Sequence, residues 1–309
     1  MISRRNIRVK VMQELYARQS RDSMQDKLNP VVNLQKQLEQ CRQLFVYLLY
    51  YITEVARYSE TDARLRANKN LPSEEDKNVN TKIAGNQLLW TILENESFKR
   101  EKSSRTLDFV DTPEQVKKTY NKLQVSDIYQ KYVHQNSREK KDEKELILFI
   151  FTNLMLPDED FIYHVEENFS NWDDDADMMD QLIMNYLHKP GAYSLQQVIG
   201  EEKTKFAKDL LLTAIDKSDY ALELIKPKLK NWDSERIAVL DMILMQMGVC
   251  EFLYFETIPP KVTINEYIDL AKEYSTPQSG HFVNGILDSI HKELLAGNKI
   301  HKIDFKQKA

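Results

Sequence analysis

The scarcity of glycine constrains this chain most. Seven of its 309 residues are glycine, and nearly every segment repeats its apolar residues at the helical period. Tight turns and phosphate-binding loops depend on glycine, so the pattern argues against turn-dense all-β folds and against glycine-rich nucleotide sites. The sequence therefore predicts an all-α chain with few tight turns, and its length indicates roughly two domains.

The charge balance limits how the chain can bind nucleic acid. Lys and Arg number 43 and Asp and Glu number 48, which gives a formal net charge of −5. A mildly acidic chain cannot bind phosphates over its whole surface, so any nucleic-acid contact must come from a local basic patch.

Three features of the sequence indicate the cellular compartment of the protein. The longest apolar run, Leu44–Ile52, is about half the length that a membrane-spanning helix needs. The first residues lack the apolar core of a secretory signal. Cys41 and Cys250 each lie among apolar residues, which favours buried thiols in a reducing compartment over a disulfide or a nucleophile. We therefore expect a cytoplasmic protein with no membrane contact.

The middle of the chain is acidic. Residues 145–188 hold eleven acids and no lysine or arginine, with dense clusters at 158–160 and 173–175. Such clusters could hold Mg²⁺. Each cluster also precedes an apolar-periodic segment, where acids favour the positive end of a helix. The helix-start interpretation is the stronger of the two, and we predict no metal site.

An internal echo, that is, a short sequence similarity, relates the middle of the chain to its last third. The tripeptide Asn-Trp-Asp occurs at 171–173 and again at 231–233, with apolar positions repeating at the same offset. Either a degenerate duplication or two similar helical hairpins would produce it, and the sequence leaves both open.

The last third has clear helix boundaries. Pro227 predicts a kink or break, and the pair at 259–260 predicts a helix stop. Thr263 and Glu266 have the spacing of a capping box. Pro277 is expected at a first helical position, and Gly297 is expected to end the final helix.

Catalytic motifs are absent from the sequence, which has no zinc-protease, Walker, dinucleotide or serine-hydrolase pattern. We therefore predict no cofactor, no catalytic residue and no enzymatic activity. The positive signal is a predicted basic helix over 3–20, whose Arg4, Arg5 and Arg8 lie on or near one face. Guanidinium groups grip phosphates bidentately, and Tyr16 could stack on a base. The same pattern also fits a solvated surface, anionic lipid or an acidic protein partner.

A family resemblance is carried by ordered motifs in residues 234–290, namely ERIAVLD, then IPPKVTINEYIDLAK, then FVNGILD. RRNIRVKVMQELYA at the start fits as well. The chain resembles the NusB transcription antitermination family over about 1–20 and 203–309, which leaves 21–202 as a large helical insertion of unknown role. The resemblance implies a pair of small helical bundles that catalyse nothing.

The resemblance also implies a function and a set of partners. Members of the family bind boxA RNA together with NusE, a small-subunit ribosomal protein, and so join an RNA polymerase complex that resists termination. The positions implied to bind RNA are Arg4, Arg5, Arg8, Tyr16, Lys261 and Phe282. The positions implied to bind the protein partner are Tyr16, Glu251, Gln278 and Phe282. Asn6 stands where many members have another arginine, and Gln278 and Gly280–His281 depart from the family's usual acidic and basic pair.

Other interpretations of these residues are structural. Phe282 fits a core position, Glu251 fits an exposed acid near the end of an amphipathic helix, and Gly285 fits a close approach of two helices. The alternative function is a helical protein-interaction module without RNA binding, in which the acidic middle attracts a basic partner. A third possibility comes from NusB-like domains fused to RNA methyltransferases, of which this chain could be at most the RNA-guiding part.

Overall fold

The computed structural model describes residues 2–20, 29–103, 113–190, 194–229 and 237–303. Every regular element in these ranges is a helix, which confirms the predicted all-α class. The chain divides into two compact units. The terminal unit comprises Ser3–Leu38 and Glu201–Ala309, and the central unit comprises Met1–Ile2 and Glu39–Gly200.

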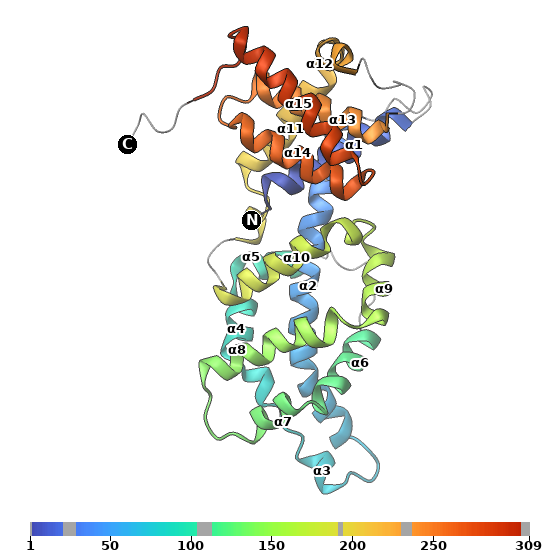
Figure 1. Cartoon of the computed structure of the whole chain (residues 1–309). Coiled ribbons are helices and arrows are strands. Elements are labelled where there is room, and N and C mark those ends of the chain that lie inside the picture. Colours follow the sequence, from blue (N-terminus) through green and yellow to red (C-terminus); the bar gives the residue numbers. More distant parts are fainter. Residues whose placement is uncertain (1, 21–28, 104–112, 191–193, 230–236, 304–309) are drawn as a thin grey trace. The chain divides into compact units, whose positions relative to one another are not determined.

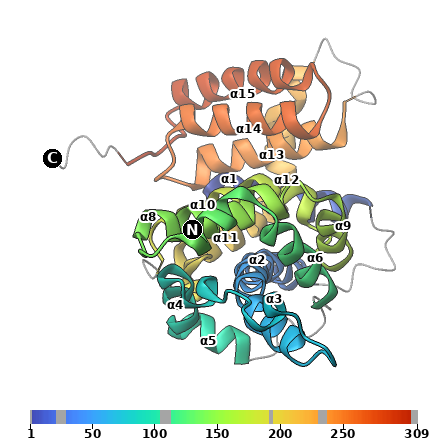
Figure 2. The same cartoon turned by 90° about the horizontal axis from the view of Figure 1, so that it is seen from below.

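The terminal unit is built on three long C-terminal helices that pack on one another (Figures 1 and 2). The first of them also contacts α1 and α11. The elements of this unit are α1 (Arg4–Ser20), the first nine residues of α2 (Pro30–Ala67), α11 (Glu201–Asp216), α12 (Ser218–Ile225), a 3₁₀ turn (Lys226–Leu229), α13 (Val239–Tyr254), α14 (Pro260–Tyr274) and α15 (Ser279–Ala296).

The close approach of helices in this unit occurs at Gly248, and the expectation for Gly285 is wrong. A Cβ atom on Gly248 of α13 would lie 2.9 Å from the side chain of Leu287 on α15, so a larger residue there would push the helices apart. A Cβ atom on Gly285 would meet nothing within 4 Å, and Gly285 lies on the exposed face of α15.

Helix boundaries in the last third partly follow the sequence. The break at Pro227 is confirmed, because α12 ends at Ile225 and a 3₁₀ turn follows. Gly297 is confirmed as the residue that caps α15. The capping box is wrong, because Pro260 begins α14 and Thr263 lies inside it. Pro277 likewise precedes α15, whose N-cap is Gln278.

The central unit is organised around α2. Between Leu44 and Ala56 its side chains are buried on every face of the helix, with half-buried exceptions at Tyr50 and Glu54. This explains the long apolar run as a core helix. The other elements here are α3 (Glu74–Lys77), a 3₁₀ turn (Lys82–Gly85), α4 (Gln87–Glu94), α5 (Glu96–Ser103), α6 (Pro113–Gln124), α7 (Asp127–His134), α8 (Lys140–Phe149), a π-helical turn (Ile150–Met155), α9 (Glu159–Asn168), α10 (Trp172–His188) and a 3₁₀ turn (Leu195–Gln197).

Two polar segments of this unit are helical. Helix α2 continues through a polar stretch to Ala67. The charged residues 140–144 begin α8. Among the described residues, no helix is long and apolar enough to cross a membrane.

The acidic clusters begin helices. The carboxylate of Asp158 accepts a hydrogen bond of 3.1 Å from the backbone N–H of Asp160 at the start of α9, and residues 173–175 form the first turn of α10. No group of three or more potential metal ligands occurs in the part of the chain that the structure describes. Both cysteines are buried, as expected. The second Asn-Trp-Asp tripeptide of the internal echo, at 231–233, lies outside the described residues.

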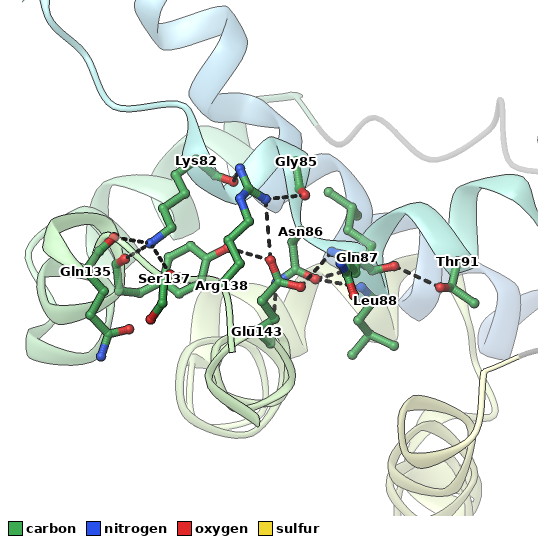
Figure 3. A network of polar contacts seen from close by, with 12 residues as sticks. Lys82, Gly85, Asn86, Gln87, Leu88, Thr91, Gln135, Ser137, Arg138 and Glu143 are labelled. Carbon is green, nitrogen blue, oxygen red and sulfur yellow. Dashed lines mark hydrogen bonds and ion pairs between the residues drawn. The ribbon is translucent and has the colours of Figure 1, made fainter. Parts of the chain in front are cut away.

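A polar network ties the turn before α4 to α7 and α8 (Figure 3). The ammonium of Lys82 donates to the carbonyl oxygens of Tyr132, Gln135 and Ser137 at 2.7, 2.6 and 3.1 Å. Glu143 is buried, and its carboxylate accepts from Tyr132 Oη and from the backbone N–H of Gln87. Such satisfied buried groups fix the loop between these helices.

Candidate nucleic-acid interface

The N-terminal helix α1 packs against the rest of the terminal unit through one apolar stripe. Ile7, Val11, Met12 and Leu15 are buried, and the helix packs against α11 and α13. The three arginines predicted near one face of this helix do not share one environment, because Arg8 is buried at 2% exposed, as is Lys10. A charged side chain is buried only when partners compensate it, so the contacts of Arg8 decide its role.

Arg8 is held by two carboxylates. Its Nε and Nη2 atoms donate to Glu251 Oε1 and Oε2 at 2.7 and 3.1 Å, and Nη1 donates to Glu266 Oε2 at 3.1 Å. Burial alone would lower the pKa of Arg8, but the hydrogen bonds and charge of Glu251 outweigh it and raise the pKa above its ordinary value. The guanidinium is therefore a permanent cation.

Glu251 is equally enclosed. Besides Arg8, its carboxylate accepts from Thr263 Oγ1 at 3.0 Å and from Tyr267 Oη at 2.9 Å. Burial, followed by the charge of Glu251, raises the pKa of Tyr267, so its hydroxyl remains a donor. The side chain of Glu251 is 0% exposed.

These contacts give two predicted site residues a structural role. Arg8 was expected to contact RNA and Glu251 to contact a partner, yet their side chains meet inside the terminal unit, 243 positions apart in the sequence. Neither is open to a ligand in this structure. The physical reason is that a bidentate Arg–carboxylate pair with further donors satisfies both charges in the interior.

Arg4 and Arg5 have a different environment. Their side chains are 34% and 35% exposed and form ion pairs of 2.6 Å with Glu202 and Glu273. Both glutamates are themselves more than half exposed, and the bond from Arg4 lowers the pKa of Glu202. Exposed pairs of this kind contribute at most about 1 kcal/mol, so a phosphate can replace the carboxylate at small cost.

An aromatic ring supports this end of α1. The guanidinium carbon of Arg4 lies 5.4 Å from the ring centroid of Phe206 on α11, and that of Arg8 lies 5.6 Å from it. Cation–π contacts at this distance orient a guanidinium without using its donors. The ring therefore leaves the N–H groups of Arg4 available to an anion.

The other predicted residues are spread over the unit. Tyr16 is 45% exposed, eleven positions after Arg5, or about 16 Å along the helix. Lys261 is exposed at the start of α14, about 18 Å along that helix from Glu273, the partner of Arg5. Gln278 is exposed at the start of α15, and Phe282 is half-buried one turn later.

Several residues that shape this surface were missed from the sequence. Phe206 and Tyr267 carry no signal that separates them from ordinary core or helix residues, and the spacing of Thr263 pointed to a helix cap. Lys302 follows the last helix, and its ammonium donates to the carbonyl oxygens of Glu251 and Phe255 at 2.8 and 2.7 Å. The sequence around Lys302, which holds other lysines, does not signal that contact.

Comparisons of the chain with family models, curated proteins and solved structures all find similarity to NusB proteins. The model of the NusB family matches residues 160–292. The chain is 44% identical over 96 residues to the transcription antitermination protein NusB of Finegoldia magna, covering 31% of this chain and 70% of that protein. It is 41% identical over 97 residues to the NusB of Salinibacter ruber, covering 31% of this chain and 61% of that protein.

Coverage differs among these relatives. The 47% identity to the NusB of Chloroherpeton thalassium extends over 72 residues, which is 23% of this chain and 34% of that protein. The crystal form of T. maritima NusB is 30% identical, with a TM-score of 0.30, covering 37% of this chain and 79% of that chain. The motifs, and the identity over more than two thirds of the Finegoldia protein, lead to one conclusion: the chain belongs to the NusB family.

Proposed function

We propose that the protein is a transcription antitermination factor that binds boxA-type RNA together with NusE, and that it meets the RNA polymerase complex through that assembly. In this proposal the NusB-like domain comprises residues 1–20 and 203–309, and 21–202 is an insertion. The role is binding, not catalysis. The observation that carries the proposal is the pair of partly exposed arginine side chains, 34% for Arg4 and 35% for Arg5, each bonded to an exposed glutamate.

Within this site, Arg4 and Arg5 exchange Glu202 and Glu273 for phosphates, and the two side chains contact the RNA backbone. Tyr16 offers an exposed ring for base stacking farther along α1. Lys261 adds a cation at the start of α14. Gln278 and the half-buried edge of Phe282 contribute to the surface for NusE. Arg8 does not contact RNA, and with Glu251 it fixes the position of α1.

The proposal is tested with a double variant, Arg4→Ala with Arg5→Ala. Binding of boxA RNA is measured by fluorescence anisotropy with NusE present, over a series of salt concentrations. We expect a weaker affinity and a shallower slope of log K against log[salt]. The slope of a single strand should fall by about 0.7 for each phosphate that the variant no longer neutralises.

The matched control removes two exposed arginines from α2 in the central unit, Arg57→Ala with Arg64→Ala, and so changes the net charge equally. It should keep the affinity and slope of the natural protein. Equal binding by both double variants would exclude Arg4 and Arg5 from the interface. Stable NusE capture without RNA binding by the natural protein would favour the interaction module instead.

A further inference from the structure

The chain beyond α15 forms a short strap, residues 297–303, that returns to α13. The backbone N–H of Gly297 donates to Glu293 O, and that of Lys299 donates to Leu294 O, both at 2.9 Å. Between them Asn298 has φ of 51°, a left-handed conformation that asparagine tolerates better than most residues. This turn reverses the direction of the chain at the end of α15.

The strap ends on the last turn of α13. The two hydrogen bonds of the Lys302 ammonium go to the carbonyls of Glu251 and Phe255, and the N–H of Ile303 donates to Glu256 O at 3.1 Å. Carbonyls at a helix C-terminus carry partial negative charge. Glu251 O also accepts from the N–H of Phe255 at 3.3 Å and Phe255 O from the N–H of Ile258 at 3.1 Å, and the ammonium of the strap adds a charged donor to each carbonyl.

One residue links the strap to α1. Glu251 accepts Lys302 on its backbone carbonyl and Arg8 on its carboxylate, so the two cations hold it from different sides. Glu251 thus connects the end of the strap to the first turns of the N-terminal helix. The position of Arg4 and Arg5 depends on that helix, which Arg8 anchors.

We propose that Lys302 is a positioning residue for RNA binding, which acts by holding Glu251 in place for Arg8 and makes no contact with RNA itself. This inference rests on the proposed function. It assigns the strap the role of a brace that keeps the arginine end of α1 in the geometry that phosphates require.

The test compares Lys302→Met, which keeps most of the aliphatic stem, with Lys302→Arg, which restores the cation. We expect Lys302→Met to weaken boxA RNA binding about tenfold with NusE present, and Lys302→Arg to recover most of that affinity. The salt slope should not change, because every phosphate keeps its cation. Lys299→Met, an exposed lysine in the same strap, is the matched control and should bind normally.

Two outcomes would overturn the proposal. A salt slope reduced by about 0.7 would show that Lys302 contacts a phosphate directly. An unchanged affinity, measured where the variant remains folded by circular dichroism, would show that the contact stabilises the fold alone.

A readout without RNA separates this inference from the proposed function. Hydrogen exchange of the Arg8 guanidinium N–H groups, followed by NMR, should accelerate about tenfold in Lys302→Met and not in Lys299→Met. If exchange accelerates but the natural protein binds no RNA, the proposed function fails, while the role of Lys302 in holding Glu251 for Arg8 is retained. Unchanged exchange would refute that role of Lys302, whatever the RNA result.

The pH dependence of stability reports the burial of Lys302. Burial lowers the pKa of Lys302 from 10.5 to about 8, although the charges of Glu251 and Glu256 act in the opposite direction. Between these values the unfolded chain keeps the proton that the folded chain has released, so stability rises with pH. The stability of the natural protein relative to Lys302→Met should therefore increase from pH 8 to 10.5.

Discussion

Replacing Arg8 by methionine is expected to lower the free energy of unfolding by about 3–5 kcal/mol, because it leaves the buried carboxylate of Glu251 without its counter-charge. The side chains of this pair are 2% and 0% exposed, so water cannot compensate the missing charge. Urea unfolding followed by circular dichroism measures the change. Arg5→Met, which removes an exposed ion pair, should cost less than about 1 kcal/mol.

A second variant separates the effect of charge pairing from the effect of packing. The double change Arg8→Met with Glu251→Gln removes both charges and keeps an amide oxygen that can accept from Thr263 Oγ1 and Tyr267 Oη. It should recover much of the stability that Arg8→Met removes. If Arg8→Met costs no more than Arg5→Met, the buried pair does not anchor α1.

Replacing Phe161 by alanine is expected to cost about 3–5 kcal/mol in the central unit, the range for truncating a buried phenylalanine. Phe161 on α9 is 0% exposed, and its ring centroid lies 4.7 Å from that of Tyr51 on α2. The variant would leave a cavity beside the core helix of that unit. Urea unfolding again supplies the measurement.

The control for this change lies on the same helix. Tyr163 is 63% exposed, so Tyr163→Ala should change the free energy of unfolding by no more than about 0.5 kcal/mol. If Phe161→Ala and Tyr163→Ala were equally mild, α9 would not pack into the core as described. A large destabilisation from both would place Tyr163 in a contact that its exposure does not suggest.

Sequence reasoning predicted most of the helices because apolar periodicity reports burial directly. It placed α1, the break after Ile225 and the end of α15 within a few residues. It failed where a polar residue has a structural partner elsewhere in the chain. Thr263 has the spacing of a cap, yet its hydroxyl donates to Glu251 on the preceding helix.

The candidate site shows the same limit more sharply. Arg4, Arg5 and Arg8 are alike in sequence, and each lies near the same face of α1. What separates Arg8 is a carboxylate 243 positions away, and no local pattern reveals such a pairing. The resemblance to the NusB family implied RNA binding for all three arginines. The structure places Arg4 and Arg5 at the surface and Arg8 in the interior.

The most direct test of the account is an NMR titration that observes the arginine Nε–H groups while boxA RNA is added in the presence of NusE. Assignments come from Arg4→Lys, Arg5→Lys and Arg8→Lys variants. The account predicts that the signals of Arg4 and Arg5 shift as RNA saturates the protein, while the signal of Arg8 stays in place and exchanges slowly throughout. A shift of Arg8 with Arg4 and Arg5 unchanged would contradict it.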